Sequence, residues 1–199
     1  MIRKLTEEDF DEAVNVICKS FMTVAEEYDI TKENAPAYTA FATDVHKLRT
    51  WMYEQHRPMY GYFDGDKMIG YYNLMIKDKE CELGSLSVLP EYRHRNIGLT
   101  LLEDSLSNAS EYGCTIMKLS IVEENTVLRK WYEKHGFIHT GTVKYDFFPF
   151  VCGYMEKRLE ETPNAETLAA TKEVEEMKKH PSKHKSYSDV DDMMEDLLK

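Results

Sequence analysis

Residues 93–98, which read RHRNIG, combine residue types that could bind a phosphate group. A backbone that wraps a phosphate needs several N–H groups pointing into one hollow, with a helix starting directly behind it. Asn96 and Gly98 are of the types that tolerate the left-handed conformations such a hollow requires, and Arg93 and Arg95 add positive charge at its rim. Taken alone, the stretch also fits an ordinary basic turn, so the neighbouring elements must decide.

The flanking sequence predicts the elements that would position this stretch. Residues 81–88 (CELGSLSV) have the composition of a strand, and Pro90 ends it. Leucine and isoleucine recur at helical spacing over residues 97–110, which predicts a helix directly behind the basic stretch. Residues 115–122 (TIMKLSIV) predict a short buried strand, and residues 125–135 predict another helix.

The remaining elements complete one domain. In chain order we expect a short strand at 2–5, a helix from the N-cap Thr6 to about Phe21, a loop at 23–38, a helix at 40–55, a β-hairpin that turns at Asp64-Gly65, and two closing strands at 139–148 and 151–159. Strands and helices in this order predict an α/β or α+β domain built on a mixed sheet.

The composition changes after about Glu160. Aromatic residues nearly vanish, a charged helix is expected before Pro181, and residues 189–199 place Val190, Met193, Met194, Leu197 and Leu198 on one helical stripe. The sequence leaves open whether this stripe docks on its own subunit, on a neighbouring copy or on a foreign partner, or stays disordered.

The overall composition limits the partners of the chain. A formal net charge of -11 argues against nucleic acid and anionic membranes, because both require an extended basic surface. Cysteines 18, 81, 114 and 152 form no CxxC pair and the N-terminus has no apolar signal segment, so we expect reduced thiols and a cytoplasmic location. The histidines lack metal-ligand spacing, so no metal site is expected.

Two segments together resemble the GCN5-related N-acetyltransferase (GNAT) family. Residues 88–98 (VLPEYRHRNIG) resemble its motif A, in which a strand, a proline, R/Q-x-x-G-x-G/A and a helix follow in this order. Residues 125–137 (NTVLRKWYEKHGF) resemble its motif B, N-x(6)-Y-x-x-x-G-F. The family usually has Gly where this chain has Asn96, and because Asn tolerates positive φ we expect the loop geometry to survive.

The resemblance implies the GNAT fold for residues 1–159, a mixed central β-sheet of about six to seven strands flanked by helices, and a charged helical C-terminal extension at 160–199. It also implies acetyl-CoA as cofactor. In the family the strand before motif A carries a bulge and separates from the next strand, and the pantetheine arm lies in the gap; Gly84 and Ser85 are small enough to permit this distortion. The implied cofactor-binding residues are Leu86, Ser87, Val88, Arg93, His94, Arg95, Asn96, Ile97, Gly98, Leu99, Thr100 and Asn125.

Two residues match the family's catalytic positions. Tyr132 corresponds to the tyrosine that stands near the thioester sulfur as general acid, and Glu82 to a glutamate that takes the amine proton. Each has a plainer interpretation, an aromatic filling the helix–sheet interface for Tyr132 and a solvated strand carboxylate for Glu82. Glu80 is the alternative base.

The resemblance implies an acetyl-CoA-dependent N-acetyltransferase acting on a primary amine of a small molecule, an amino acid derivative or a peptide. The acceptor would enter past Tyr28, Tyr38, Tyr145 and Phe147, which could equally be core residues. The alternative function is a catalytically silent module that binds acyl-CoA. A homodimer that uses the C-terminal helix as a contact is a further expectation.

Overall fold

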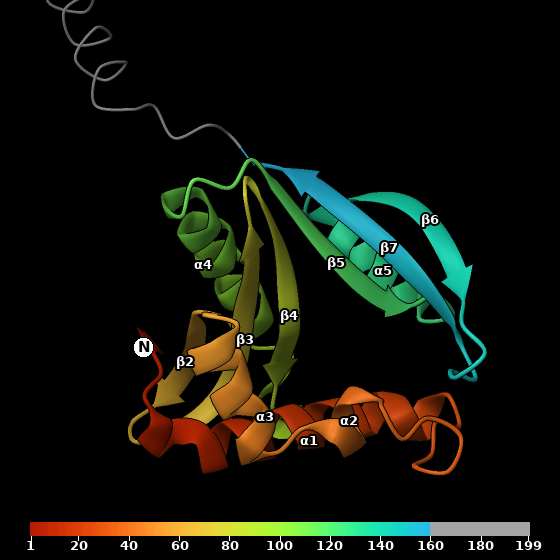
Figure 1. Ribbon diagram of the computed structural model, residues 1–199, viewed down its shortest axis with the longest axis horizontal. Coiled ribbons are helices and arrows are strands. Elements are labelled where there is room, and N and C mark those ends of the chain that lie inside the picture. Colours follow the sequence, from red (N-terminus) through yellow and green to blue (C-terminus); the bar gives the residue numbers. More distant parts are fainter. Residues whose placement is uncertain (160–199) are drawn as a thin grey trace, which may run out of the picture. The chain divides into compact units, whose positions relative to one another are not determined.

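The computed structural model describes residues 1–159 of the 199-residue chain and shows one mixed β-sheet with helices on both faces (Figure 1). The strands follow one another across the sheet in the order β1-β2-β3-β4-β5-β7-β6, and only the β4–β5 pair is parallel. The strands are β1 Ile2–Lys4, β2 Met59–Asp64, β3 Lys67–Lys77, β4 Glu80–Val88, β5 Ile116–Val122, β6 Ile138–Lys144 and β7 Val151–Arg158.

Helices α1 and α4 enclose the middle of the sheet, since both pack on β3 and β4 (Figure 1). The helices are α1 Phe10–Glu27, α2 Thr39–Ala42, α3 Val45–Arg49, α4 Ile97–Glu111 and α5 Thr126–Lys134, with short 3-10 turns at Glu7–Asp9 and Pro90–Tyr92 and a π turn at Thr50–Glu54. The main core lies between these layers and includes Phe10, Ile17, Tyr72, Leu101 and Met117. A second, largely aromatic cluster joins α1 and α2 to the end of β7.

Strands β4 and β5 stay paired for only a short distance. They are in register at Glu80–Ile116, Cys81–Met117 and Glu82–Lys118, and beyond this point the two strands separate (Figure 1). A parallel sheet normally keeps pairing along its strands, because unpaired backbone groups inside a protein cost free energy. The separation therefore opens a place for an external partner in the middle of the sheet.

A β-bulge in β4 accompanies this separation. Tyr71 of β3 faces Ser87 and Asn73 faces Gly84, so β4 holds one residue more than β3 in this interval. Within the bulge Ser85 has a φ of 51°, a left-handed conformation that costs a non-glycine residue about 1 kcal/mol or more. The bulge predicted at Gly84 and Ser85 is confirmed.

Most predicted elements are confirmed, with two corrections to the helices and one to a strand: the strand predicted over 139–148 stops at Lys144, because the chain then turns, with the Phe148 N–H donating to the Tyr145 carbonyl. The first helix does not end near Phe21: α1 continues to Glu27 because its last turns are buried against the second cluster, with Ala25 only 2% exposed. The predicted helix over residues 40–55 is wrong as one element. It breaks at Thr43, which is extended, and restarts at Asp44, whose carboxylate accepts a hydrogen bond of 2.7 Å from the Lys47 N–H.

The predicted C-terminal extension at 160–199, with its apolar stripe, lies outside the described residues. Within residues 1–159, no helix is both long enough and apolar enough to cross a membrane. All four cysteines carry free thiols.

Candidate active site

The loop at residues 93–98 presents a row of unused backbone donors. Within the described part of the chain, no acceptor pairs with the backbone N–H groups of residues 94–99. His94 and Asn96 have φ values of 63° and 60°, and left-handed residues at such positions turn successive N–H groups into one hollow. Helix α4 begins directly behind, so the positive end of its dipole adds to the attraction for an anion.

Asn96 takes the left-handed conformation expected of it, whereas Gly98 has no positive φ and lies in the first turn of α4; His94 is the second left-handed residue of the loop. The prediction that Asn96 takes the glycine-like conformation is confirmed by its φ. A Cβ added at Gly98 would find Val88 Cγ2 as its nearest neighbour at 3.8 Å, an ordinary contact. The packing of the protein therefore does not require glycine at this position, whereas close approach of a ligand to the loop would favour it.

Arg93 differs from the expectation that it charges the rim of the loop. Its guanidinium turns onto α1, where Nη2 donates to the Ser20 carbonyl at 3.1 Å and to Thr23 Oγ1 at 3.0 Å. Arg95 stays exposed and lies over the Tyr92 ring at 5.2 Å. Arg93 thus ties the loop to α1, whereas Arg95 leaves its charge exposed at the rim.

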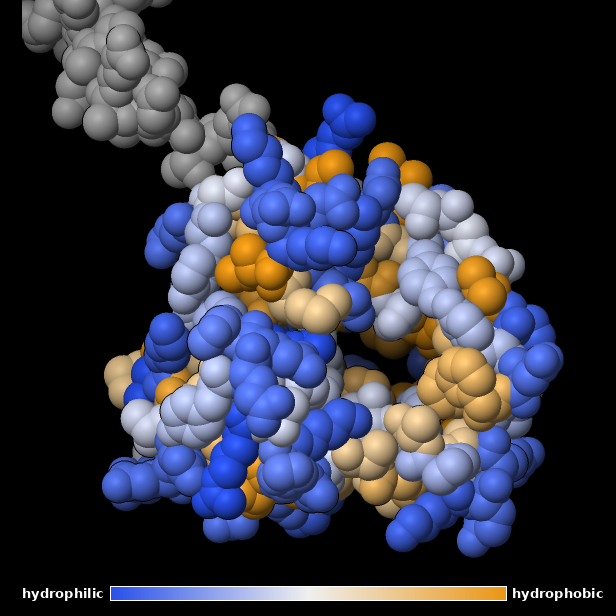
Figure 2. Space-filling model, in the orientation of Figure 1, coloured by the Kyte–Doolittle hydropathy of each residue, from blue (hydrophilic) through white to orange (hydrophobic). Residues whose placement is uncertain are grey.

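Other predicted cofactor residues surround the gap between β4 and β5. Leu86 and Val88 lie beyond the last β4–β5 pair, and the Ser87 hydroxyl donates within the bulge to the Ser85 carbonyl at 2.7 Å. The Thr100 hydroxyl donates to the Asn96 carbonyl at 3.1 Å, inside its own helix. Figure 2 shows a hollow at the gap, above α1 and α2 in the view of Figure 1. The unpaired loop, the open space at Gly98 and this gap fit an elongated ligand with a phosphate group, such as acetyl-CoA.

Glu82 lies at the apex of the gap, because Glu82–Lys118 is the last pair before the strands part. Its carboxylate is exposed, and its charge acts on two neighbours. The hydrogen bond between the Tyr145 and Tyr154 hydroxyls and burial raise the pKa of Tyr154, and the charges of Tyr145, Cys152 and, least of all, Glu82 add to the rise. Burial lowers the pKa of Arg57, and the Glu82 charge opposes that change. In contrast, Glu80 is held by Lys118 Nζ at 2.5 Å.

Tyr132 is buried on α5, where its ring packs edge-on against Phe137 with centroids 5.3 Å apart. Burial raises the pKa of its hydroxyl, so the group keeps its proton at neutral pH. Among the described residues no partner accepts a hydrogen bond from this hydroxyl or donates one to it. The position therefore fits both a packing role and a proton donor.

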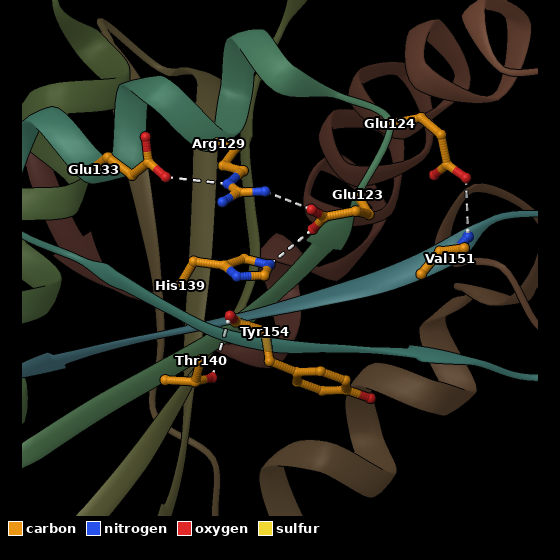
Figure 3. Close-up of polar contacts among 8 residues, drawn as sticks. All are labelled: Glu123, Glu124, Arg129, Glu133, His139, Thr140, Val151 and Tyr154. Carbon is orange, nitrogen blue, oxygen red and sulfur yellow. Dashed lines mark hydrogen bonds and ion pairs between the residues drawn. The ribbon is translucent and has the colours of Figure 1, made fainter.

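The corner between β5 and α5 sets the position of Tyr132. Asn125 caps α5 by accepting a hydrogen bond of 3.0 Å from the Leu128 N–H, as its residue type predicts. Glu123 lies between Arg129 of α5, at 2.5 Å, and His139 of β6, at 3.0 Å (Figure 3). Glu124 accepts a hydrogen bond from the Val151 N–H at 3.2 Å. These contacts fix α5 on β6 and β7.

The predicted acceptor-side aromatics fall into different surroundings. Tyr38 is a core residue, packed between Phe21 and Phe150. Tyr28 is partly buried in the same cluster, whereas Phe147 is 58% exposed and stacks on Tyr145 with centroids 5.1 Å apart.

Tyr154 is a candidate site residue that the sequence interpretation missed. Its hydroxyl lies 2.7 Å from that of Tyr145, and its ring points to the side of the sheet away from His139 (Figure 3). It lies on β7 opposite Ser120, two positions along β5 from Lys118, the partner of Glu82. The alternation of strand residues could have placed it on the Glu82 face, had the register been known. Within residues 1–159, no three His, Cys, Asp or Glu side chains cluster to hold a metal ion.

Comparison with known proteins decides the family. The family model described as "Acetyltransferase (GNAT) family" matches residues 22–137, more than half of the chain. The chain belongs to this family. The predicted family and the GNAT fold are thereby confirmed, and membership agrees with the predicted transferase class.

Individual relatives share a third or less of their aligned residues with this chain. A spermidine N(1)-acetyltransferase of Thermoplasma acidophilum is 33% identical over 100 residues, which is 50% of this chain and 58% of that relative's length. The PaiA N-acetyltransferase of the same organism, solved in complex with coenzyme A, superposes with a TM-score of 0.69 at 25% identity, covering 79% of this chain and 98% of that one. The ribosomal-protein-S18-alanine N-acetyltransferase of Escherichia coli superposes with a TM-score of 0.63 at 15% identity, covering 83% and 97%, and shows the fold alone.

The left-handed conformation of Asn96 gives a direct prediction. Replacing Asn96 with Ala should weaken coenzyme A binding about fivefold to tenfold, because a Cβ without a local hydrogen-bonding group disfavours positive φ by about 1 kcal/mol. Replacing Asn96 with Gly should leave the Kd for coenzyme A unchanged or reduce it. Isothermal titration calorimetry measures both. Equal affinity for coenzyme A in the Ala and Gly variants would show that the conformation of residue 96 does not matter for binding.

Proposed function

We propose that the protein is an acetyl-CoA-dependent N-acetyltransferase that acetylates a primary amine by direct attack. The observation that carries this proposal is the combination of the unpaired N–H groups of residues 94–99 with the gap between β4 and β5. These are the backbone features that a pyrophosphate and an extended pantetheine arm require. The PaiA N-acetyltransferase structure, solved in complex with coenzyme A, supports the same cofactor.

Residues 93–99 and Leu86, Ser87 and Val88 would hold the cofactor, with Thr100 and Asn125 beside them. When bound, acetyl-CoA supplies an activated acyl thioester. Glu82, exposed at the apex of the gap, accepts the proton of the acceptor amine, which must be neutral to attack. Tyr132, which burial keeps protonated, donates a proton to the leaving thiolate.

We infer that the acceptor is a small cationic amine. Carboxylates and tyrosine hydroxyls gather on the acceptor side, since Glu82 acts on Tyr154 and the charges of Glu27 and Glu124 act on Tyr28. Carboxylates beside aromatic rings favour ammonium groups. The name of the spermidine N(1)-acetyltransferase relative supports a polyamine as the first acceptor to test. The four free thiols support a cytoplasmic location, and a dimer contact through residues 160–199 stays a prediction.

A thiol-release assay tests the activity. Purified protein, acetyl-CoA and a panel of spermidine, putrescine, free amino acids and short peptides should release coenzyme A with at least one amine, and fastest with a polyamine. The alternative is a silent module that binds acyl-CoA, and it would bind coenzyme A in calorimetry without releasing thiol with any amine. Absence of coenzyme A binding would contradict both functions.

Replacing Glu82 with Gln should lower kcat/KM by about 10²-fold or more, because a general base is lost. The rise of kcat/KM with pH that reflects ionisation of this base should disappear from the pH–rate profile. Glu80→Gln is the matched control, since Glu80 lies on the same strand and is paired with Lys118. An E80Q variant that loses the pH dependence while E82Q keeps it would transfer the role to Glu80.

Replacing Tyr132 with Phe should lower kcat about tenfold to a hundredfold and leave the Kd for coenzyme A unchanged. The moderate size follows because a thiol is a fair leaving group, so protonation helps without being essential. The melting temperature should not change, because the ring contacts with Phe137 remain. Full activity in Y132F would leave Tyr132 as a packing residue only.

A further inference from the structure

The bulge in β4 is held by side chains instead of by a regular strand pairing. The buried Asn73 of β3 donates from Nδ2 to the Gly84 carbonyl at 3.1 Å, and Ser87 donates from Oγ to the Ser85 carbonyl at 2.7 Å. Asn73 is 0% exposed and Ser87 is 1% exposed. Two consecutive carbonyl groups of the bulge, those of Gly84 and Ser85, therefore accept hydrogen bonds from buried side chains of the protein instead of from water.

Asn73 and Gly84 are fitted to each other. A Cβ added at Gly84 would lie 2.5 Å from Asn73 Oδ1 and 2.9 Å from Nδ2, distances that real Cβ atoms do not show. Only glycine lets the Asn73 amide come this close to the β4 backbone. The two residues face each other in the β3–β4 register, and the Asn73 side chain fills the space that is free because Gly84 has no side chain.

Arg57 fixes the orientation of this amide. Its Nη1 donates to Asn73 Oδ1 at 3.4 Å, which leaves Nδ2 as the group that faces Gly84. The guanidinium is itself held by Gln55 at 2.8 Å, by Met75 Sδ at 3.1 Å and by the Trp51 ring at 4.9 Å. The Glu82 charge acts on Arg57, so the amide and the candidate base share one neighbour.

We propose that Asn73 is a positioning residue that sets the shape of the β4 bulge for the acyl-CoA, with Gly84 as its obligatory partner. This inference rests on the proposed function, because the bulge lies directly before Leu86, Ser87 and Val88. Asn73 does not touch the cofactor. Asn73 donates a hydrogen bond to the Gly84 carbonyl and thereby fixes the left-handed conformation of Ser85. The backbone that follows Ser85 runs along the gap.

The test compares Asn73→Ser, Gly84→Ala and the double variant. Serine is too short to reach the Gly84 carbonyl, so N73S should raise the Kd for coenzyme A and the KM for acetyl-CoA about tenfold, with the KM for the amine changed less than about twofold. G84A should weaken binding by a similar factor, because the added methyl group pushes the amide away. In N73S the space is free, so adding G84A should cause no further loss.

Asn108→Ser is the matched control. Asn108 is a partly buried amide on α4, away from the bulge, and it donates to the Tyr72 hydroxyl at 3.0 Å and to Asp104 at 3.1 Å. It should lower the melting temperature about as much as N73S without changing the Kd for coenzyme A. A loss of stability alone would make the two variants indistinguishable in binding.

The possible outcomes distinguish a failure of the proposed function from a failure of the role of Asn73. If the unmodified protein fails to bind coenzyme A, the proposed function fails. If it binds and folded N73S binds equally well, the role of Asn73 is wrong while the function stands. Additive losses of N73S and G84A would also overturn the pairing. If N73S does not fold, G84A alone carries the test, because it keeps the Asn73 hydrogen-bonding groups and should still raise the Kd about tenfold.

Discussion

Backbone N–H and C=O groups in a folded protein must find partners, and a sheet that stops pairing in its middle leaves such groups without them. Strands β4 and β5 part after Glu82 and Lys118, and the loop behind β4 leaves the N–H groups of residues 94–99 unpaired. The rest of the site follows from these two interruptions. One opens a gap for an extended chain, and the other offers donors and a helix N-terminus to a phosphate group. Leaving these groups unpaired lowers the free energy of unfolding. Burial of apolar side chains in the two core clusters offsets this loss.

The elements around the interruptions are tied to one another, which keeps the site preorganised. Arg93 connects the loop to α1, Asn73 connects β3 to the bulge, and Glu123 connects α5 to β6. A site whose backbone is already in place loses little conformational entropy when the ligand binds. Arg93 hydrogen-bonds to Ser20 and Thr23, so a motion of α1 would reach the loop through this side chain.

Features that depend on local residue type could be predicted from the sequence. Asn96 takes positive φ, Asn125 caps α5 and Gly136 follows that helix with a φ of 85°, each as its residue type suggests. The bulge and the gap could be predicted only from the family resemblance, because no local sequence pattern shows that two strands will separate. The length of α1 and the break at Thr43 were missed, since burial of Ala25 and the cap at Asp44 decide them. Asn73 and Tyr154 were missed because only the strand register brings them to Gly84 and to the face that carries Glu82, and Arg57 was missed because its hydrogen bond to Asn73 joins residues 16 positions apart.

The claim that the unpaired backbone is the cofactor site is tested most directly by amide hydrogen–deuterium exchange with and without coenzyme A. The account predicts that bound coenzyme A slows exchange most at residues 94–99, whose N–H groups have no partner among the described residues, and next at residues 86–88 along the gap. Unchanged exchange at residues 94–99 under saturating coenzyme A, with protection elsewhere in the protein, would contradict it.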